Sequence, residues 1–506
     1  MSNNANLYLL FQEAMTRSSG EDFLRVPGGD VLTYDATHVQ CGRMQAALQS
    51  LGVGKGDRVV VQVGKSIEAV LLYLACLRSG AIYVPLNTAY TAAEVSYFID
   101  DAEPALFVCD PSAVDALDDE TRNRVPHIQT LSTAAGGSLT ELAESMPAGK
   151  DIAHCEATDL AAILYTSGTT GRSKGAMLSH GNLASNAQVL HQYWHFEDGD
   201  VLLHALPIFH VHGLFVALHC ALLNGSTVWF LPKYDVDTIL RLLPQSTVMM
   251  GVPTFYTRLL ERQDFGHQQC EKMRLFISGS APLLAETHVE FEARTGFRIL
   301  ERYGMTETGM ITSNPYNGER LAGTVGYPLP GVAVRIADSQ GAELPLGQTG
   351  VLEVKGPNVF AGYWRMPEKT SEEFREDGWF ITGDLATMAE DGRVTIVGRE
   401  KDLIISGGYN IYPKEIELAI DDIPGVKESA VIGVPHPDFG EGVVAVVVSE
   451  PAAALQATQI SDALAGKLAR FKQPKRVVFV DELPRNTMGK VQKVTLREQY
   501  GKSFNE

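Results

Sequence analysis

A single polar loop, YTSGTTGRSKG at positions 165–175, concentrates groups that could bind an anion. Gly168 and Gly171 allow backbone conformations that point successive N–H groups inward. Hydroxyl groups and two cations surround them, and the residues that could line an anion cradle are Thr166, Ser167, Gly168, Thr169, Thr170, Gly171, Arg172, Ser173 and Lys174. The loop is not a standard P-loop, which needs Gly-Lys-Ser/Thr at the start of a helix. Phosphate binding and a flexible Gly/Ser/Thr surface loop both remain open at this point.

Further motifs follow the loop in a fixed order along the chain. They are FHVHG (209–213), ERYGMTET (301–308), ITGDL (381–385), VGREKDLIISGGYNIYPKEIE (397–417) and PRNTMGK (484–490). Together with the loop they resemble the adenylate-forming superfamily of acyl-CoA synthetases, luciferases and peptide-synthetase adenylation domains. The likeness extends from about residue 160 to the C-terminus, and the upstream segment YVPLN (83–87) also fits it.

The resemblance implies a reaction in two steps with ATP, Mg²⁺ and coenzyme A. A carboxylate attacks the α-phosphorus of ATP and releases pyrophosphate, and a thiol then takes the acyl group from the acyl-adenylate. The loop would hold the β- and γ-phosphates. Thr306 matches a hydroxyl contact to the α-phosphate and Glu307 a magnesium ligand, which suits an ion that prefers one or two carboxylates plus substrate oxygens. In isolation, Thr306 and Glu307 could equally cap a helix at a surface turn.

Other residues match the superfamily's contacts to adenosine. Asp384 in ITGDL corresponds to the ribose ligand, since a carboxylate can accept hydrogen bonds from both sugar hydroxyls. Arg399 resembles a second ribose or phosphate contact. Tyr303 would stack on one face of the adenine, while the turn at 278–281, which includes Ser280 and Ala281, would offer backbone hydrogen bonds on the other. A core position for Tyr303 is the alternative.

Several residues are implicated in the change between the two steps. Lys490 matches the adenylation lysine that a mobile lid domain brings to the α-phosphate, and Lys401 occupies the hinge of that lid. Gly408 matches a small residue lining the pantetheine tunnel. His210 matches a histidine that gates the acyl pocket, although the neighbouring His212 leaves this assignment open and a lone histidine in an apolar segment is more often structural.

Arg302 bears on which acid is activated, because many members of the superfamily have a small residue at this position. The resemblance places the acyl pocket beside the YGMTE segment, with Ser278 and Met305 among its lining residues and Arg258 on a neighbouring helix. Burial of an unpaired guanidinium costs several kcal/mol, so Arg302 pairs either with a protein carboxylate such as Glu301 or with a second carboxylate of the substrate. Surrounding segments resemble malonyl-CoA synthetases more than long-chain or aromatic ligases. Malonate is therefore the expected acid, with methylmalonate as an alternative.

The elements that position these motifs follow an α/β pattern. Residues 58–86 alternate a β-branched run, a helix-like apolar repeat and a second β-branched run, and the same rhythm recurs at 95–109 and 201–254. Mixed, largely parallel sheets with flanking helices and a small β subdomain are predicted for a large N-terminal domain at 1–397. A hinge at 398–402 and an α+β lid domain at 403–506 complete the expected organisation. Residues 134–150 are predicted to form a surface loop.

Bulk properties exclude several other classes of protein. The 506 residues are 45% hydrophobic, enough for two or more domains, and the net charge of −19 argues against a nucleic-acid partner. Six scattered cysteines form no CxxC pair, so we expect them to be buried, reduced and structural. No signal peptide or membrane span is evident, which predicts a cytoplasmic protein without membrane contact.

Three alternatives to an acyl-CoA synthetase for malonate are retained. The chain could activate a medium-chain or aromatic acid, it could load a carrier protein as a stand-alone adenylation domain, or it could bind nucleotide without catalysis. Intact Lys174, Glu307, Asp384 and Lys490 argue against the last. A lysine acetyltransferase acting on Lys490 is a further expected partner, since acetylation would remove the charge that adenylation needs.

Overall fold

The computed structural model describes residues 4–132, 136–166, 173–406, 409–450, 453, 455–465, 467–486 and 489–504. Its chain divides into two compact units. The N-terminal unit contains residues 1–333 and 355–378, and the C-terminal unit contains residues 334–354 and 379–506. The predicted domain limits at 397 and 403 remain predictions. The same holds for the hinge between them, whose role is defined by a movement of the lid domain.

A six-stranded sheet forms one part of the N-terminal unit. Its order is β6 (His127–Thr130), β5 (Leu106–Cys109), β3 (Arg58–Gln62), β4 (Ile82–Pro85), β7 (Leu160–Thr166) and β8 (Lys174–Ser179). The predicted βαβ unit at 58–86 is confirmed, because β3 and β4 are parallel and the helix Ile67–Ser79 connects them. The Ser66 side chain caps this helix by accepting the Ala69 N–H, and Gly80 ends it with a φ of 68°.

A nine-stranded sheet forms the other part. Its order is β15 (Tyr327–Pro328), β14 (Gly309–Ser313), β13 (Leu300–Met305), β12 (Leu275–Ser278), β11 (Val248–Gly251), β9 (Val201–His204), β10 (Thr227–Phe230), β1 (Asp22–Arg25) and β2 (Val31–Thr33). Strands β9 to β13 pair in parallel, and the rhythm at 201–254 correctly predicts the part that contains β9, β10 and β11. Their carboxyl ends therefore meet at one edge, where ligands bind in open α/β sheets.

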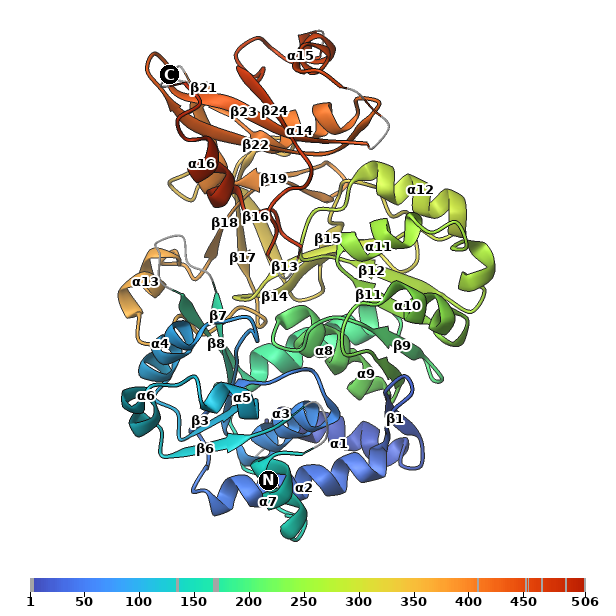
Figure 1. Cartoon of the computed structure of the whole chain (residues 1–506), viewed down its shortest axis with the longest axis vertical. Coiled ribbons are helices and arrows are strands. Elements are labelled where there is room, and N and C mark those ends of the chain that lie inside the picture. The colour runs from blue at the N-terminus through green and yellow to red at the C-terminus, as the bar shows by residue number, and fades with distance from the viewer. Residues whose placement is uncertain are drawn as a thin grey trace. The chain divides into compact units, whose positions relative to one another are not determined.

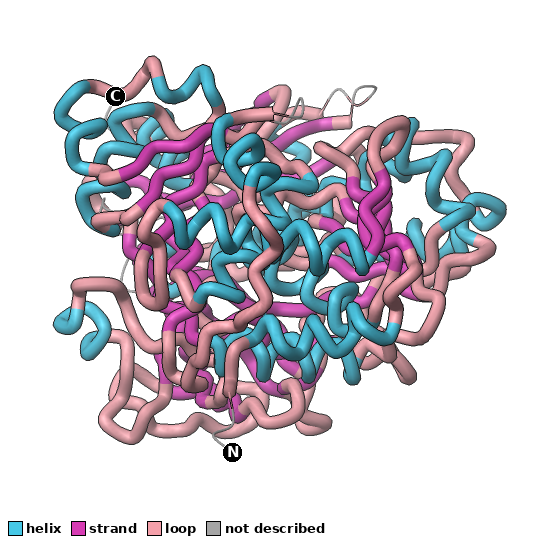
Figure 2. Tube along the Cα trace, turned by 90° about the horizontal axis from the view of Figure 1, so that it is seen from below, coloured by secondary structure: helices cyan, strands magenta, loops and turns pink. Residues whose placement is uncertain are grey.

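Helices flank these sheets, and Figure 2 shows cyan helices lying beside magenta strands. In the N-terminal unit they are α1 (Leu7–Arg17), α2 (Tyr34–Ser50), α3 (Ile67–Ser79), α4 (Ala92–Ala102), α5 (Pro111–Val114), α6 (Asp119–Arg124), α7 (Ser138–Ser145), α8 (His180–Tyr193), α9 (His219–Asn224), α10 (Val236–Leu242), α11 (Pro253–Leu260), α12 (Ala285–Thr295) and α13 (Pro367–Glu372). The α/β prediction is confirmed (Figure 1). The surface loop predicted at 134–150 was wrong, because it contains α7, whose Leu139 and Ala143 are buried.

The C-terminal unit contains two further sheets. One has the order β16 (Ala333–Ala337), β17 (Gly350–Lys355), β18 (Phe380–Met388) and β19 (Val394–Arg399); the other has the order β21 (Tyr409–Ile411), β20 (Ile404–Ser406), β23 (Gly440–Ser449) and β22 (Val426–His436), with β24 (Arg476–Val480) paired to β23. Helices α14 (Pro413–Asp421), α15 (Ala457–Ala465) and α16 (Lys493–Tyr500) accompany them. Ile416 and Ile420 of α14 pack with Val431 and Val443 in one core, which confirms the expected α+β character.

The cysteine prediction is confirmed, since all six are free and buried. Across the described ranges, no helix is long and apolar enough to cross a membrane.

Candidate active site

The predicted anion cradle is the connection of a β-hairpin. Strands β7 and β8 are antiparallel, and Thr166 pairs with Lys174 across the hairpin. Ser173 is held at its backbone, where its carbonyl accepts the Tyr97 hydroxyl at 2.9 Å. The remaining cradle residues, Ser167, Gly168, Thr169, Thr170, Gly171 and Arg172, lie outside the described residues.

Lys174 and Glu307 belong to one buried polar network. Lys174 Nζ donates to Glu373 Oε1 at 2.8 Å and lies 4.1 Å from the centroid of the Tyr363 ring. The Tyr363 hydroxyl lies 3.1 Å from Glu307 Oε1 and 2.6 Å from Glu373 Oε2, and Thr166 Oγ1 lies 3.5 Å from Glu307 Oε1. A single hydroxyl proton can satisfy only one of these two carboxylates. The carboxylate that does not receive this proton still has another donor, because Lys174 serves Glu373 and the Thr166 hydroxyl lies near Glu307.

Burial affects the two carboxylates differently. It raises the pKa of Glu307, which is only partly offset by the hydrogen bond from Tyr363 and the charge of Lys174. Burial alone would also raise the pKa of Glu373, but hydrogen bonds from Lys174 and Tyr363 lower it. Two carboxylates in contact with Thr166 and Lys174 of the predicted cradle match the ligand preference of Mg²⁺, so the residues present fit this ion. Among the described residues, no cluster of three or more His, Cys, Asp or Glu side chains that could hold a metal ion is present, and the Glu307–Glu373 pair supplies two carboxylates only.

Tyr363 and Glu373 were missed by the sequence analysis. They lie in GYWRMPEKTSEEF (362–374), and Glu373 is 199 positions from its partner Lys174. No local spacing signals a contact of that kind. The contact between Lys174 and Glu373 forms only when folding brings the β7–β8 hairpin next to the end of α13.

The ERYGMTET motif begins in strand β13 and turns into β14. Thr306 follows the end of β13, and Tyr303 pairs with Thr312 within the β13–β14 hairpin. The neighbouring strand β12 ends at Ser278, and Ser280 beyond it has a φ of 71°, an unusual value for a residue other than glycine. Ser280 Oγ contacts His212 Nδ1 at 3.2 Å. Strained backbone of this kind is concentrated at functional sites, and Ala281 directly follows it.

Arg302 is buried and lacks hydrogen bonds at two of its nitrogen atoms. Only 3% of its surface is exposed, and Nε and Nη2 have no hydrogen-bond partner among the described residues. Burial lowers the pKa of Arg302 to about 10, although Tyr256 and Glu301 counteract it. Glu301 adjoins Arg302 on β13, so their side chains leave opposite faces of the sheet, and the Glu301 carboxylate accepts the Leu283 N–H at 3.1 Å.

The surroundings of Arg302 are shaped to hold its guanidinium. A Cβ atom at Gly279 would overlap that group, so the glycine lets the guanidinium lie in this position. Ser278 Oγ and His212 Nε2 are also buried without a hydrogen-bond partner in the described part of the chain. Buried polar atoms are almost always satisfied, and several unsatisfied ones in neighbouring segments indicate a site for a polar ligand.

The other residues predicted to line the acid pocket do not form one cluster with Arg302. Met305 is half-buried at the end of β13. Arg258 is exposed on α11, and its guanidinium lies 5.6 Å from the Tyr234 ring centroid. His210 packs its ring 4.7 Å from that of Phe209 and precedes a π-helical segment, His212–Leu218. Such segments recur at functional sites, while the gating role of His210 and the roles of Arg258 and Met305 remain predictions.

The C-terminal unit carries the other predicted residues. Arg399 Nε and Asp384 Oδ1 form an ion pair of 2.8 Å between strands β19 and β18, and Asp384 is buried. Lys401 lies in a short 3₁₀ turn, Glu400–Asp402. Lys490 is exposed on a hairpin after β24, and Gly408 lies outside the described residues.

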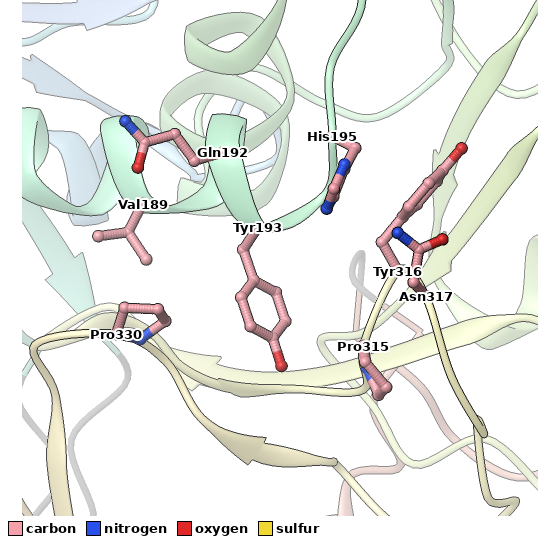
Figure 3. A pocket seen from close by; sticks show the side chains of 8 residues that line it. All are labelled: Val189, Gln192, Tyr193, His195, Pro315, Tyr316, Asn317 and Pro330. Atoms are coloured by element: carbon pink, nitrogen blue, oxygen red, sulfur yellow. The ribbon is translucent and has the colours of Figure 1, made fainter.

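A pocket of about 340 Å³ lies elsewhere in the N-terminal unit, at the C-terminal end of α8. Its lining includes Tyr193, His195 and Tyr316, and the rings of His195 and Tyr316 stack 4.8 Å apart (Figure 3). None of the predicted site residues lines it. A much smaller cavity, lined by Thr306, Gly309 and Asn186 among others, lies beside the predicted site.

Comparison with known proteins agrees with these motifs. Residues 11–364 match the AMP-binding enzyme family, and residues 415–490 match the AMP-binding enzyme C-terminal domain. The chain belongs to the AMP-binding enzyme family. The expected kinship with adenylate-forming acyl-CoA synthetases is thereby confirmed.

Individual relatives in the AMP-binding enzyme family differ in their acids. A malonate–CoA ligase of Arabidopsis thaliana is 35% identical over 90% of this chain and 80% of its own length. A feruloyl-CoA synthase of an Amycolatopsis species is 35% identical over 94% and 95% of the two chains. The crystal structure of ATP-bound MatB from Rhodopseudomonas palustris is 55% identical, covers 99% of this chain and 100% of its own, and superposes with a TM-score of 0.97.

Proposed function

We propose that this enzyme is an ATP-dependent ligase that joins malonate to coenzyme A, giving malonyl-CoA, AMP and pyrophosphate. The observation that carries the proposal is the buried guanidinium of Arg302, whose Nε and Nη2 have no hydrogen-bond partner among the residues that the structure describes. A second carboxylate on the substrate would satisfy both donors in a bidentate pair. Malonate–CoA ligases among the relatives support the same acid.

In the first step, a carboxylate oxygen of the acid bonds to the α-phosphorus of ATP and the bond to pyrophosphate breaks. Lys174 and the cradle hold the departing phosphates, and Thr306 donates to the α-phosphate. Glu307, with Glu373 beside it, would hold Mg²⁺, which neutralises the phosphate charge when bound. Binding of phosphate oxygens offers Lys174 an alternative to its ion pair with Glu373.

The C-terminal unit contributes the remaining charges in this proposal. Asp384 accepts hydrogen bonds from the ribose hydroxyls, and its ion pair with Arg399 orients its carboxylate. Lys490 stabilises the negative charge that gathers at the α-phosphate. In the second step, the CoA thiolate attacks the acyl carbonyl and AMP leaves. Lys401 would act as the hinge of the lid for this step, and Gly408 would line the tunnel for the pantetheine group.

The test is a panel of malonate, methylmalonate, acetate, octanoate and coumarate, with ATP, Mg²⁺ and CoA. Release of pyrophosphate and formation of the thioester are followed separately. Malonate should give the highest kcat/KM, with methylmalonate next. A preference for octanoate or coumarate would contradict the role of Arg302.

A second candidate is an aromatic acid, because one relative is a feruloyl-CoA synthase. An aromatic tail would leave Arg302 buried and unpaired, which costs several kcal/mol. Acyl transfer to a carrier protein in place of CoA is the third possibility, and the presence or absence of a CoA thioester in the same assay distinguishes it.

We also propose that the enzyme works in the cytoplasm and that Lys490 is a target for a lysine acetyltransferase. The supporting observation is the exposure of Lys490 on its hairpin. Acetylation would remove the positive charge and so stop adenylation. Mass spectrometry of the enzyme after chemical acetylation, combined with pyrophosphate release, tests this; loss of adenylation without modification of Lys490 would contradict it.

A further inference from the structure

The hairpin that carries Lys490 is fixed at its base by its own backbone. Arg485 and Val491 form an antiparallel bridge, and Gln492 N–H donates to the Pro484 carbonyl at 2.8 Å. Asn486 makes two bonds to the lysine itself: its N–H donates to the Lys490 carbonyl at 2.9 Å, and its Oδ1 accepts the Lys490 N–H at 2.9 Å. The backbone of Lys490 is therefore fixed although its side chain is exposed.

Arg485 joins this hairpin to the sheet beneath it. Its Nη1 donates to the Gly489 carbonyl at 2.6 Å, and its Nη2 forms an ion pair with Glu428 of β22. One planar guanidinium thus bonds the residue directly before Lys490 and a strand of the core at the same time. A lysine ammonium, which is a point charge without this fork, cannot hold both partners in one geometry.

A second ion pair anchors the chain just after the hairpin. Lys493 Nζ lies 2.6 Å from Glu417 Oε1, and Glu417 is buried on α14 and also accepts the Val431 N–H at 2.9 Å. Leu496, one turn further along α16, is buried against β22 and β23. The hairpin is thus attached on both sides, by Arg485 before Lys490 and by Lys493 after it.

We propose that Arg485 is a positioning residue for the adenylation step, acting through the placement of Lys490; the inference rests on the proposed function. The ion pair with Glu428 is partly exposed, with side chains 30% and 22% accessible, so it contributes little to stability. The ion pair would act by fixing the position of Lys490, because a displacement of a catalytic group by about 1 Å can slow a reaction about 100-fold. The thioester step does not use Lys490 and should not depend on Arg485.

The experiment compares Arg485→Gln, Arg485→Lys and the wild-type full-length enzyme in two assays. One follows pyrophosphate release from malonate and ATP, and the other follows thioester formation from synthetic malonyl-adenylate and CoA. Arg485→Gln should slow the first by about 10- to 100-fold and leave the second within about twofold. Arg485→Lys should recover only part of the loss. Arg476→Gln, which removes an arginine bond to the Ser503 carbonyl in the same unit, is the matched control and should change neither rate.

The outcomes separate the positioning role from the proposed function. Equal loss in both assays, or no loss in either, would overturn the role of Arg485. If Arg485→Gln does not fold, Glu428→Gln removes the other end of the same ion pair and must show the same selective loss. A wild-type enzyme that does not adenylate malonate would contradict the proposed substrate, and the acid found by the panel would then replace malonate in both assays.

Discussion

Arg302 in the N-terminal unit and Lys490 in the C-terminal unit are both cations of the proposed mechanism, but their surroundings differ in opposite ways. Arg302 is removed from water, lies in a space that Gly279 leaves open, and has two nitrogen atoms without partners in the described ranges. Lys490 is exposed, while the backbone around it is fixed. In the proposed mechanism, Arg302 recognises a constant group and can be buried in advance, whereas Lys490 has to enter and leave the site and so has to stay solvated.

The largest effect is expected from Lys490→Ala. Removal of a charge that acts only in the transition state should slow pyrophosphate release by about 100- to 1000-fold. Thioester formation from synthetic acyl-adenylate should be almost unchanged. Stopped assays of the two half-reactions measure this, with Lys502→Ala as the control for loss of an exposed lysine in the same unit. Equal loss in both half-reactions would remove the distinction between the two cations.

Arg302→Met should have the next largest effect and should act in two directions. The kcat/KM for malonate should fall by about 100-fold because the distal carboxylate loses its partner, while the value for acetate should change little. Stability should rise, by about 1 to 4 kcal/mol, because a buried charge with incomplete hydrogen bonding is replaced by an apolar side chain. Acid-specific kinetics and thermal unfolding measure the two effects.

Arg78 provides the matched control for that variant. It is also fully buried, but its guanidinium donates to Gln45 Oε1, the Tyr8 hydroxyl and the Gly149 carbonyl. Arg78→Met should therefore destabilise the protein, since it leaves these acceptors unpaired. If both arginine variants shift the free energy of unfolding in the same direction, Arg302 is not a buried charge reserved for a substrate carboxylate.

The sequence predicts the regular parts of this molecule better than its polar network. The β-branched and apolar runs at 58–86 correctly predict β3, α3 and β4, because local periodicity determines them. Residues 134–150 were mistaken for a loop, since glycines and small residues at their start mask the short apolar face of α7. The contact of Lys174 with Glu373 could not be predicted, because it depends on how two distant segments pack. Motif resemblance supplied the candidate residues but not their partners.

Tyr363→Phe tests that unpredicted network and should have a moderate effect. The Tyr363 hydroxyl lies between Glu307 and Glu373 and orients the carboxylate to which it donates, and loss of such a supporting bond weakens metal binding by about tenfold or more. The Mg²⁺ concentration for half-maximal pyrophosphate release should rise accordingly. Tyr34→Phe, which loses a buried hydroxyl bonded to the Ser226 carbonyl, is the control. An unchanged Mg²⁺ requirement would separate Tyr363 from the metal site.

The smallest effect concerns Asp421, a buried charge in the C-terminal unit without a proposed task. Burial raises the pKa of Asp421 from 3.8 to about 7, despite the Ser429 hydroxyl, which donates to Oδ1 at 2.7 Å. A carboxyl group with a higher pKa in the folded state binds its proton more tightly there. The free energy of unfolding therefore falls as the pH rises from about 4 to about 7.

Asp421→Asn should remove this penalty and raise the free energy of unfolding at pH 8 by on the order of 1 kcal/mol, with a smaller gain at pH 5. Both half-reactions should keep their rates. Denaturant unfolding at the two pH values, with kinetics on the same samples, provides the measurement. Both variants should gain stability, but only Arg302→Met should lose activity with malonate. That difference would distinguish a charge buried for substrate recognition from one that is buried without a role in the reaction. If Asp421→Asn gains no more at pH 8 than at pH 5, its carboxyl group does not titrate in this range and the contrast fails.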